Sequence, residues 1–255
     1  MNDQVVLQID GAVARLRFVN PGKFNAMSRR MWRELAQHMQ TIAHSPALRV
    51  VVLSGEGGHF CAGGDIGEYP DFRFDEAALR DFHENDVWGG LGALLACELP
   101  VIACIEGHCM GAGVEMASCC DLRVAGASAR FGAPIARLGF PMAPREAELV
   151  VREAGLATAR EMLLQAAVLD APTLLARGFL NAVLPDAAVA ADAEDRARRV
   201  AALSPLAARL NKRTVRALSH GQRAADLLAD AYSYAEHPEH QEGINAFLGK
   251  RTPVF

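Results

Sequence analysis

A glycine turn that leads into a carboxylate is the stretch with the clearest chemical potential. Gly111, Ala112 and Gly113 stand together just before Glu115. Small residues let another group approach the backbone closely, and the first N–H groups of a helix have no helical partner. Those N–H groups lie at the positive end of the helix dipole, so the turn suits an oxyanion. We expect Glu115 in the first helical turn beside such amides, or else an ordinary strand-to-helix turn with a first-turn acid.

The elements around this turn form a repeated pattern. Residues 50–65, 101–115 and 122–135 each read as an apolar strand, a glycine turn, a short strand such as His59–Cys61, and then small residues. Three similar units predict a few turns of a ββα spiral in which each unit buries its apolar face against the next. Stacking would place Gly64 and Ala112 at equivalent points of neighbouring turns. Their two N–H groups could then converge on one oxygen, which is the geometry of an oxyanion hole.

Composition narrows the class of protein. The chain has 255 residues, of which 51% are hydrophobic, enough for one sizeable core or for one domain with a helical appendage. The net charge of −4 and the lack of a lysine-rich stripe argue against a nucleic-acid partner. Six cysteines without a CxxC pair predict buried free thiols in a reducing compartment and no metal site. Without a basic, apolar leader or a membrane-length apolar run, we expect a soluble cytoplasmic protein that does not enter a membrane.

The remaining elements are predicted from periodicity. Val5–Ile9 and Val13–Phe18 alternate around a turn and predict a β-hairpin, and Ser28 can cap the following helix. After Pro185 the chain is nearly all helix, and it is too thin to form a core of its own. We therefore divide the chain into a spiral core over residues 1–186 and a C-terminal helical region over residues 187–255 that packs on the spiral or on a partner subunit.

The segment between the first two repeats is ambiguous. Residues 77–97 have helical spacing, but Gly89, Gly90 and Gly92 weaken the middle. With residues 68–74 this segment forms either a mobile pocket wall or a helix pair that packs closely at the glycines.

Five motifs in order resemble the crotonase superfamily, the enoyl-CoA hydratase/isomerase fold, along nearly the whole chain. The family's Arg-Pro…Asn-Ala-Leu, Phe-x-Ala-Gly-x-Asp-Leu/Ile and Gly-Gly-Gly-x-Glu…Cys-Asp patterns have counterparts here. The matching segments are NPGKFNAM at 20–27, FCAGGDI at 60–66, GAGVE at 111–115 with Cys120-Asp121, FGAP at 131–134, and the ending with Glu242-Gly243, Ala246-Phe247, Lys250-Arg251 and Phe255.

The resemblance implies an α/β fold, a crotonase-like spiral of repeated ββα units with a C-terminal helical trimerisation region. It implies a coenzyme A thioester as substrate, a homotrimer or a dimer of trimers, and no metal or separate cofactor. By motif position the oxyanion hole consists of the N–H groups of Gly64 and Ala112, and Glu115 is the acid or base. Where the family usually has glycine, this chain has Ala112. A backbone N–H donor needs no particular side chain, so Ala112 can serve if it adopts the required backbone angles.

One position departs from the family pattern. Hydratases of this family carry a second glutamate just after the Phe-Gly-x-Pro motif, and this chain has Ile135 there. A single carboxylate can still move a proton between carbons, as in double-bond isomerisation. Glu146 is the best candidate for a second acid or base, although we expect it to be a solvated surface residue. The other candidates, with the same expectation, are Glu148, Glu68, Asp71 and His83.

The same resemblance suggests which residues contact the coenzyme A thioester. Lys23 and Ala26 lie on the first loop, Ala62 is expected near adenine and pantetheine, and Lys250 would reach a phosphate from a neighbouring subunit. The complete set is Lys23, Ala26, Ala62, Gly63, Asp65, Ile66, Gly111, Ile135 and Lys250.

Two further functions remain open from the sequence. The first is another reaction on the same oxyanion hole, such as thioester hydrolysis, decarboxylation or C–C cleavage. The second is a non-catalytic member that binds acyl-CoA or RNA, for which Arg29, Arg30 and Arg33 are the nearest basic cluster. A solvated helix face explains these arginines better, and we expect His108 and the cysteines at 61, 109, 119 and 120 to be structural.

Overall fold

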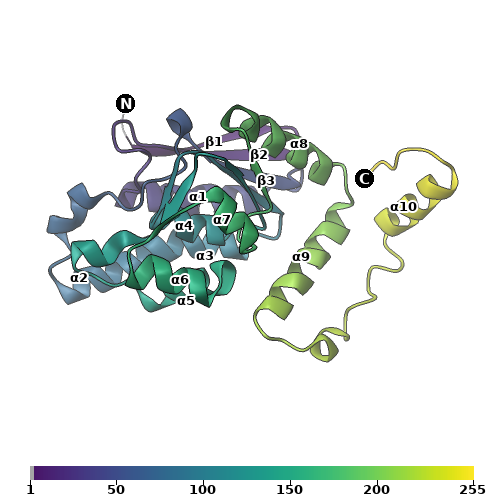
Figure 1. The fold of residues 1–255 in the computed structure, drawn as a ribbon. Coiled ribbons are helices and arrows are strands. Elements are labelled where there is room, and N and C mark those ends of the chain that lie inside the picture. The colour runs from purple at the N-terminus through teal and green to yellow at the C-terminus, as the bar shows by residue number, and fades with distance from the viewer. Residues whose placement is uncertain (1–2) are drawn as a thin grey trace.

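Two β-sheets form the frame of the fold in the computed structural model, which describes residues 3–255 (Figure 1). The larger sheet has the strand order β1-β2-β3-β4-β6-β9 and the smaller has the order β5-β7-β8. The strands are β1 (Gln4–Asp10), β2 (Val13–Val19), β3 (Val50–Gly55), β4 (Val101–Ile105), β5 (His108–Met110), β6 (Leu122–Gly126), β7 (Arg130–Gly132), β8 (Val168–Asp170) and β9 (Ala182–Leu184). The predicted hairpin is confirmed as antiparallel β1 and β2, and the other neighbours in the larger sheet are parallel.

Helices surround this frame and continue into a C-terminal extension. The α-helices are α1 (Arg29–Ala43), α2 (Glu76–Asp81), α3 (Trp88–Ala96), α4 (Ala112–Ser118), α5 (Pro144–Ala154), α6 (Leu156–Leu164), α7 (Ala171–Ala176), α8 (Val189–Ala201), α9 (Pro205–Ser219) and α10 (Pro238–Leu248). The 3-10 segments are η1 (Glu56–Gly58), η2 (Ile66–Asp71), η4 (Pro134–Leu138), η5 (Asp186–Ala188) and η6 (Ala224–Leu227), and η3 (Phe82–Val87) is a π-helix. As predicted, Ser28 caps α1 by accepting a hydrogen bond from the N–H of Met31.

The predicted spiral is confirmed by the way the repeats stack. β3, β4 and β6 are consecutive parallel neighbours, and β5 pairs in parallel with β7 one layer away. The expected short strand at His59–Cys61 is wrong, because only Cys61 makes a bridge, to Cys109. The chain turns immediately afterwards, at Gly63 with a φ of +114°, so the ladder cannot extend.

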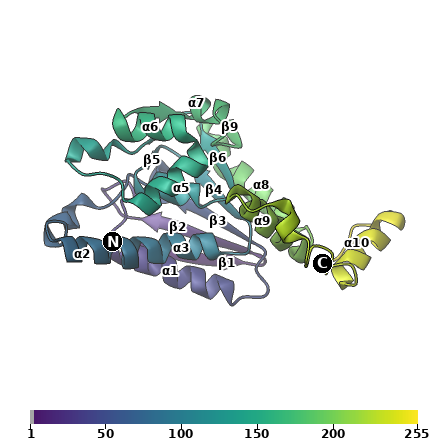
Figure 2. The same ribbon diagram turned by 90° about the horizontal axis from the view of Figure 1, so that it is seen from below.

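The parallel strands read as continuous apolar runs because both of their faces are buried. In β3, Val51 and Leu53 belong to the main core, whereas Val50 and Val52 belong to a second cluster against α8. Figure 2 shows α1 and α3 side by side along the sheet, where their contact is extensive. The larger sheet is therefore fixed by packing on both sides, and it holds the turns at its strand ends in place.

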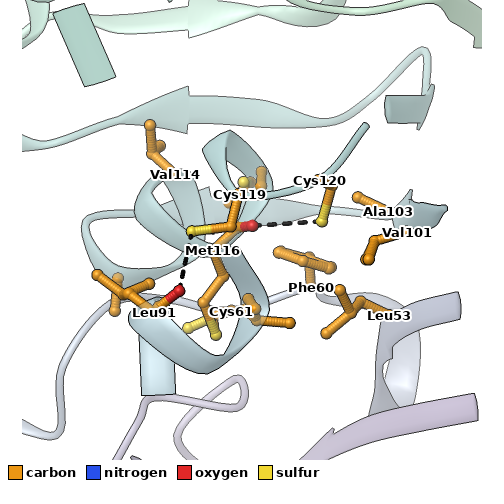
Figure 3. Close-up of a cluster of buried hydrophobic side chains, with 14 of the residues drawn as sticks. Leu53, Phe60, Cys61, Leu91, Val101, Ala103, Val114, Met116, Cys119 and Cys120 are labelled. Carbon is orange, nitrogen blue, oxygen red and sulfur yellow. Dashed lines mark hydrogen bonds between the residues drawn. The ribbon is translucent and has the colours of Figure 1, made fainter. Parts of the chain in front are cut away.

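Cysteines fill part of the main core. All six are free and buried, as expected for 61, 109, 119 and 120. Figure 3 shows the Cys119 thiol directed at the carbonyl of Leu91 and the Cys120 thiol directed at that of Met116, with Sγ–O distances of 3.8 and 3.3 Å. These thiols act as small apolar residues with a weak donor, and they bind α4 to α3.

The glycines of α3 serve packing and do not interrupt the helix. The irregular segment is instead the π-helix η3, which joins α2 to α3. At Gly90 an added Cβ would lie 2.7 Å from Cε3 of the buried Trp32 ring of α1, whereas at Gly89 it would meet open space. The structure therefore contains a close helix contact at Gly90, and other residues of the same segment line a cavity.

The C-terminal helices divide in their relation to the core. α8 packs on the larger sheet through Val189, Ala193 and Ala197, whereas α9 and α10 extend away from it (Figure 1). Lys212 of α9 is anchored to the core, with Nζ 2.6 Å from Oδ2 of Asp121. Across residues 3–255 no helix combines the length and the apolar character needed to cross a membrane.

The neighbouring glycines of α3 give a matched test of the α1–α3 contact. We expect Gly90→Ala to lower the free energy of unfolding by about 1–3 kcal/mol, because the methyl group collides with the fully packed Trp32. Gly89→Ala should instead raise it by up to about 1 kcal/mol, since it removes backbone freedom from the unfolded chain and adds no clash. Calorimetric melting of the two variants measures the difference, and equal shifts of the same sign would contradict the packing role.

Candidate active site

A cavity of about 210 Å3 lies where the second repeat stacks on the first, and most of the predicted site residues line it. η2, η3 and the segment from η4 to α5 close its other sides. The predicted residues that line it are Ala62, Gly63, Gly64, Ile66, Gly111, Ala112, Glu115, Ile135 and Glu146.

Close backbone contact between the two repeats forms one wall of the cavity. The N–H of Met110 donates to the carbonyl of Cys61, and the N–H of Cys61 donates to the carbonyl of His108, both at 2.8 Å. An added Cβ at Gly113 would lie 2.7 Å from the carbonyl oxygen of Cys61. Gly111 has a φ of +47° and caps α4. The small residues of the turn are therefore required by steric contact and by backbone conformation.

The two predicted oxyanion donors have free N–H groups at this wall. Ala112 is the first residue of α4, so its N–H has no acceptor within the helix. The parallel bridge between Met27 and Gly64 uses the N–H groups of Met27 and Asp65, and no hydrogen bond among the described residues uses that of Gly64. Both residues line the cavity that Glu115 also lines.

Glu115 occupies the first turn of α4, as predicted. It keeps an intermediate exposure because it lines the cavity, and no side chain among residues 3–255 hydrogen-bonds to its carboxyl group. Burial raises the pKa of Glu115 to about 8, and the negative charge of Glu146 adds to the shift. At neutral pH a group with this pKa is mainly protonated.

Glu146 is buried, so the expectation that it is a solvated surface residue is wrong. It lies in the first turn of α5 and shares the cavity with Glu115. His83 of η3 holds it, with 2.9 Å between Nδ1 and Oε1. Burial raises the pKa of Glu146, but the hydrogen bond from His83, backbone hydrogen bonding and the nearby charge of His83 together lower it by more, so the pKa lies below its ordinary value. Its Oε2 atom is buried without a hydrogen-bond partner among the described residues.

Tyr69 is a site residue that sequence reasoning missed. It lies on η2 and lines the cavity, and its hydroxyl oxygen would be 2.2 Å from a Cβ at Gly64. The tyrosine therefore packs directly on the oxyanion turn and requires glycine there. The only signal for it was its position in the segment 68–74, which the sequence identified as a pocket wall.

Four of the predicted coenzyme A contacts, Lys23, Ala26, Asp65 and Lys250, lie outside the cavity lining. Lys23 forms an ion pair with the buried carboxylate of Asp65, with 2.6 Å between Nζ and Oδ2, and Asp65 also caps η2. Ala26 is buried in the loop before α1. Lys250 follows α10, which lies at the far end of the molecule from α2 (Figure 1).

The other acidic candidates have structural places. Glu68 caps α1 by accepting a hydrogen bond from the N–H of Arg29 at 2.8 Å, and burial raises its pKa. Glu148 and Asp71 are exposed. His108 lies on β5 as expected, and its ring stacks on that of His59. Within the described residues no group of three or more His, Cys, Asp and Glu side chains could hold a metal ion.

Comparison with known proteins identifies the family. The model of the enoyl-CoA hydratase/isomerase family matches residues 8–255. The chain belongs to this family, within the crotonase superfamily. This enoyl-CoA hydratase/isomerase family member is therefore an enzyme that processes acyl-CoA.

Relatives of this family member match it from end to end. A crystal structure of an enoyl-CoA hydratase/carnithine racemase from Magnetospirillum magneticum superimposes with a TM-score of 0.94 at 35% identity, covering 98% of this chain and 94% of that one. The crotonyl-CoA hydratase of Syntrophomonas wolfei is 29% identical over 99% of this chain and 98% of its own length. A probable enoyl-CoA hydratase of Mycobacterium tuberculosis is 27% identical over 99% and 98%, respectively.

The raised pKa of Glu115 predicts a pH-dependent stability. An unfolded glutamate titrates near pH 4.3, so between about pH 4.3 and 8 the folded protein holds a proton that the unfolded chain has lost. The free energy of unfolding therefore falls as pH rises through this window, and Glu115→Gln removes the effect. We expect this variant to gain on the order of a few kcal/mol over the wild type between about pH 5 and 8.5.

Denaturant unfolding at both pH values measures this gain. Glu148→Gln is the matched control, because its carboxylate is exposed on α5, and it should follow the wild type at both pH values. A stability difference between Glu115→Gln and the wild type that does not change with pH would contradict a protonated Glu115.

Proposed function

We propose that this enzyme hydrates 2-enoyl-CoA thioesters, with Glu115 as general acid and Glu146 as general base. The observation that carries the proposal is that two carboxyl groups in one cavity have pKa values shifted in opposite directions. The pKa of Glu115 is raised to about 8 and that of Glu146 is lowered, so at neutral pH one is protonated and the other ionised. Two carboxyl groups whose pKa values are pushed apart divide the acid and base roles between them.

The oxyanion hole is proposed at Gly64 and Ala112. Their N–H groups have no acceptor among residues 3–255, and both residues line the cavity with Glu115. The thioester oxygen gains negative charge as water adds to the β-carbon and an enolate develops. Donors fixed by the fold stabilise that charge more than they stabilise the substrate, so they lower the barrier.

The two glutamates complete the addition of water. Oε2 of Glu146 is buried and has no hydrogen-bond partner among the described residues, and we assign it as the atom that accepts a proton once a water molecule reaches it, while His83 fixes Oε1. The water oxygen bonds to the β-carbon, its proton passes to Glu146, and the proton of Glu115 passes to the α-carbon. The product is the 3-hydroxyacyl-CoA, and one proton exchanged between the glutamates and solvent restores the starting state. Ile135 contributes only apolar surface to this cavity.

Replacing either glutamate should abolish hydration. We expect Glu115→Gln and Glu146→Gln each to lower kcat for crotonyl-CoA by roughly 100- to 10,000-fold, because each loses a proton-transfer group. Loss of the thioester-conjugated absorbance of crotonyl-CoA measures the rate. Glu148→Gln is the matched control on the same helix and should keep the wild-type rate.

The pH profile separates this mechanism from isomerisation by Glu115 alone. Hydration needs protonated Glu115, so kcat/KM should fall as pH rises through about 8. An isomerase that starts by removing a proton needs ionised Glu115, so its rate would rise through the same pH. Full activity of Glu146→Gln on a 3-enoyl-CoA together with a rising profile would overturn the hydratase proposal and support isomerisation.

The coenzyme A moiety is proposed to leave the cavity past the first loop. Lys23 is held at that loop by Asp65, and Ala62, Gly63, Ile66, Gly111 and Ile135 line the cavity. Lys250 would act from a neighbouring subunit, since α10 extends away from the core of its own chain. This arrangement requires an oligomer.

We infer a homotrimer or a dimer of trimers assembled through α9 and α10. The C-terminal region exposes large apolar side chains that a monomer would leave in water, among them Val215, Tyr232, Phe247 and Leu248. A cavity of about 790 Å3 lies between α9, η6 and α10, which an element of another copy could fill.

Assembly through this region predicts a mass of three or six times 27.4 kDa in solution. Phe247→Glu with Leu248→Glu should shift the mass to a monomer, because it places charges on the apolar contact surface. Light scattering after size-exclusion chromatography measures both masses. A wild-type monomer would contradict the inference, and Glu56→Gln, at the opposite end of the fold, serves as a control that should not change the mass.

A further inference from the structure

Arg73 is a half-buried arginine with no carboxylate partner, and it lines the cavity that holds Glu115. Within residues 3–255 its guanidinium makes no ion pair and no side-chain hydrogen bond, and the one titratable group that affects its pKa is the phenol of Tyr69. Burial lowers the pKa of Arg73, so the fold does not offset its desolvation. An uncompensated cation inside a substrate cavity calls for an anion that the fold itself does not supply.

The basic groups near Arg73 are all satisfied. Arg80 is paired with Glu76 at 3.0 Å, and Arg145 is paired with Glu84 at 2.7 Å. His83 is bonded to Glu146. The carboxylates of Glu76, Glu84 and Glu146 are therefore taken, and among these basic residues Arg73 remains the one whose N–H groups are free.

The position of Arg73 is fixed by aromatic contacts. Its Cζ atom lies 3.6 Å from the centre of the Phe140 ring and 4.6 Å from that of Tyr69. Its backbone N–H donates to the carbonyl of Tyr69 at 2.8 Å, which fixes the chain after η2. No hydrogen bond among the described residues uses the guanidinium N–H groups, which suits a planar carboxylate held by two parallel hydrogen bonds.

Arg73 also marks the junction of two cavities. The catalytic cavity continues past Tyr69, Arg73 and Phe140 into a second cavity of about 590 Å3. Lys23, the basic residue proposed for the coenzyme A side, lines neither cavity. A chain attached to a thioester at Gly64 and Ala112 would therefore reach Arg73 with its acyl end.

We propose that Arg73 binds a carboxylate at the far end of the acyl chain, so that the preferred substrates are ω-carboxyacyl-CoA thioesters. The proposal rests on the proposed acyl-CoA site, but it does not depend on which reaction occurs there. The reaction that supplies such a substrate would be one that attaches coenzyme A to one end of a dicarboxylic acid.

Binding of saturated acyl-CoA pairs tests this subsite without any turnover. The pairs are pentanoyl- and glutaryl-CoA, hexanoyl- and adipoyl-CoA, and octanoyl- and suberoyl-CoA, which differ in a terminal methyl or carboxylate. For at least one length we expect the wild type to bind the carboxylate member roughly ten- to a hundredfold more tightly, as is typical of a charge-assisted hydrogen bond. Isothermal titration calorimetry measures each Kd.

Variants show whether Arg73 is the cause of the preference. Arg73→Met should reduce the ratio of the two dissociation constants to about one, and Arg73→Lys should keep part of it. Arg30→Met removes a surface charge that is paired with Glu34 on α1, and it should keep the wild-type ratio. Circular dichroism melting checks that each variant is folded.

Three results would overturn the proposal. The first is equal wild-type affinity within every pair, and the second is an unchanged preference in Arg73→Met. The third is that Arg73→Met weakens both members of each pair and free coenzyme A by the same factor, which would place Arg73 at the coenzyme A phosphates. A carboxylate preference that appears in an enzyme unable to hydrate any 2-enoyl-CoA would support the subsite and contradict the hydratase mechanism instead.

Discussion

The site depends on a backbone contact between two successive turns of the spiral. Cys61 exchanges hydrogen bonds with His108 and Met110, which brings the segment 61–64 against the start of α4. No side chain can stand at Gly113, where a Cβ would meet the carbonyl of Cys61 at 2.7 Å. Because the larger sheet is buried on both faces, neither turn can move away from the other without disturbing the core. The free N–H groups of Gly64 and Ala112 are thus held at one cavity by the fold.

The charges in the cavity reinforce one another. Burial alone would raise the pKa of both glutamates, but the hydrogen bond from His83 and further backbone hydrogen bonding lower the pKa of Glu146 below its ordinary value. The negative charge on Glu146 in turn raises the pKa of Glu115 further. Different hydrogen-bond surroundings therefore push apart the pKa values of two residues of the same type in the same cavity. Replacing either glutamate by neutral glutamine would remove the proton transfer of that glutamate and also its effect on the pKa of the other.

The sequence predicted the parts of the fold that local pattern determines. The buried strand at 101–105, the hairpin and the amphipathic α1 follow from periodicity over a few residues. The order of the repeats placed Gly64 and Ala112 together, because stacked units align equivalent turns. The burial and the lowered pKa of Glu146 were not predictable in this way. Helical periodicity places Glu146 on a helical turn but does not determine which other elements cover that turn. Its partner His83 lies 63 residues earlier in the chain, so only the tertiary packing of η3 on α5 determines its burial.

The motifs and the pocket wall therefore contribute to different parts of the proposed function. In the proposed site, residues in the motifs would fix the thioester position, and they allow several reactions that begin with negative charge on the same oxygen. The groups that would select one reaction and one acyl chain come from η2 after Ile66, from η3 and from α5, which lie outside those motifs. The π-helix η3 is one such element, and π-helical turns are frequent at functional sites because they re-aim side chains within a helix. With Ile135 in the usual place of a carboxylate, the second acid or base would have to come from this wall, and His83 and Glu146 are positioned as a pair to provide it.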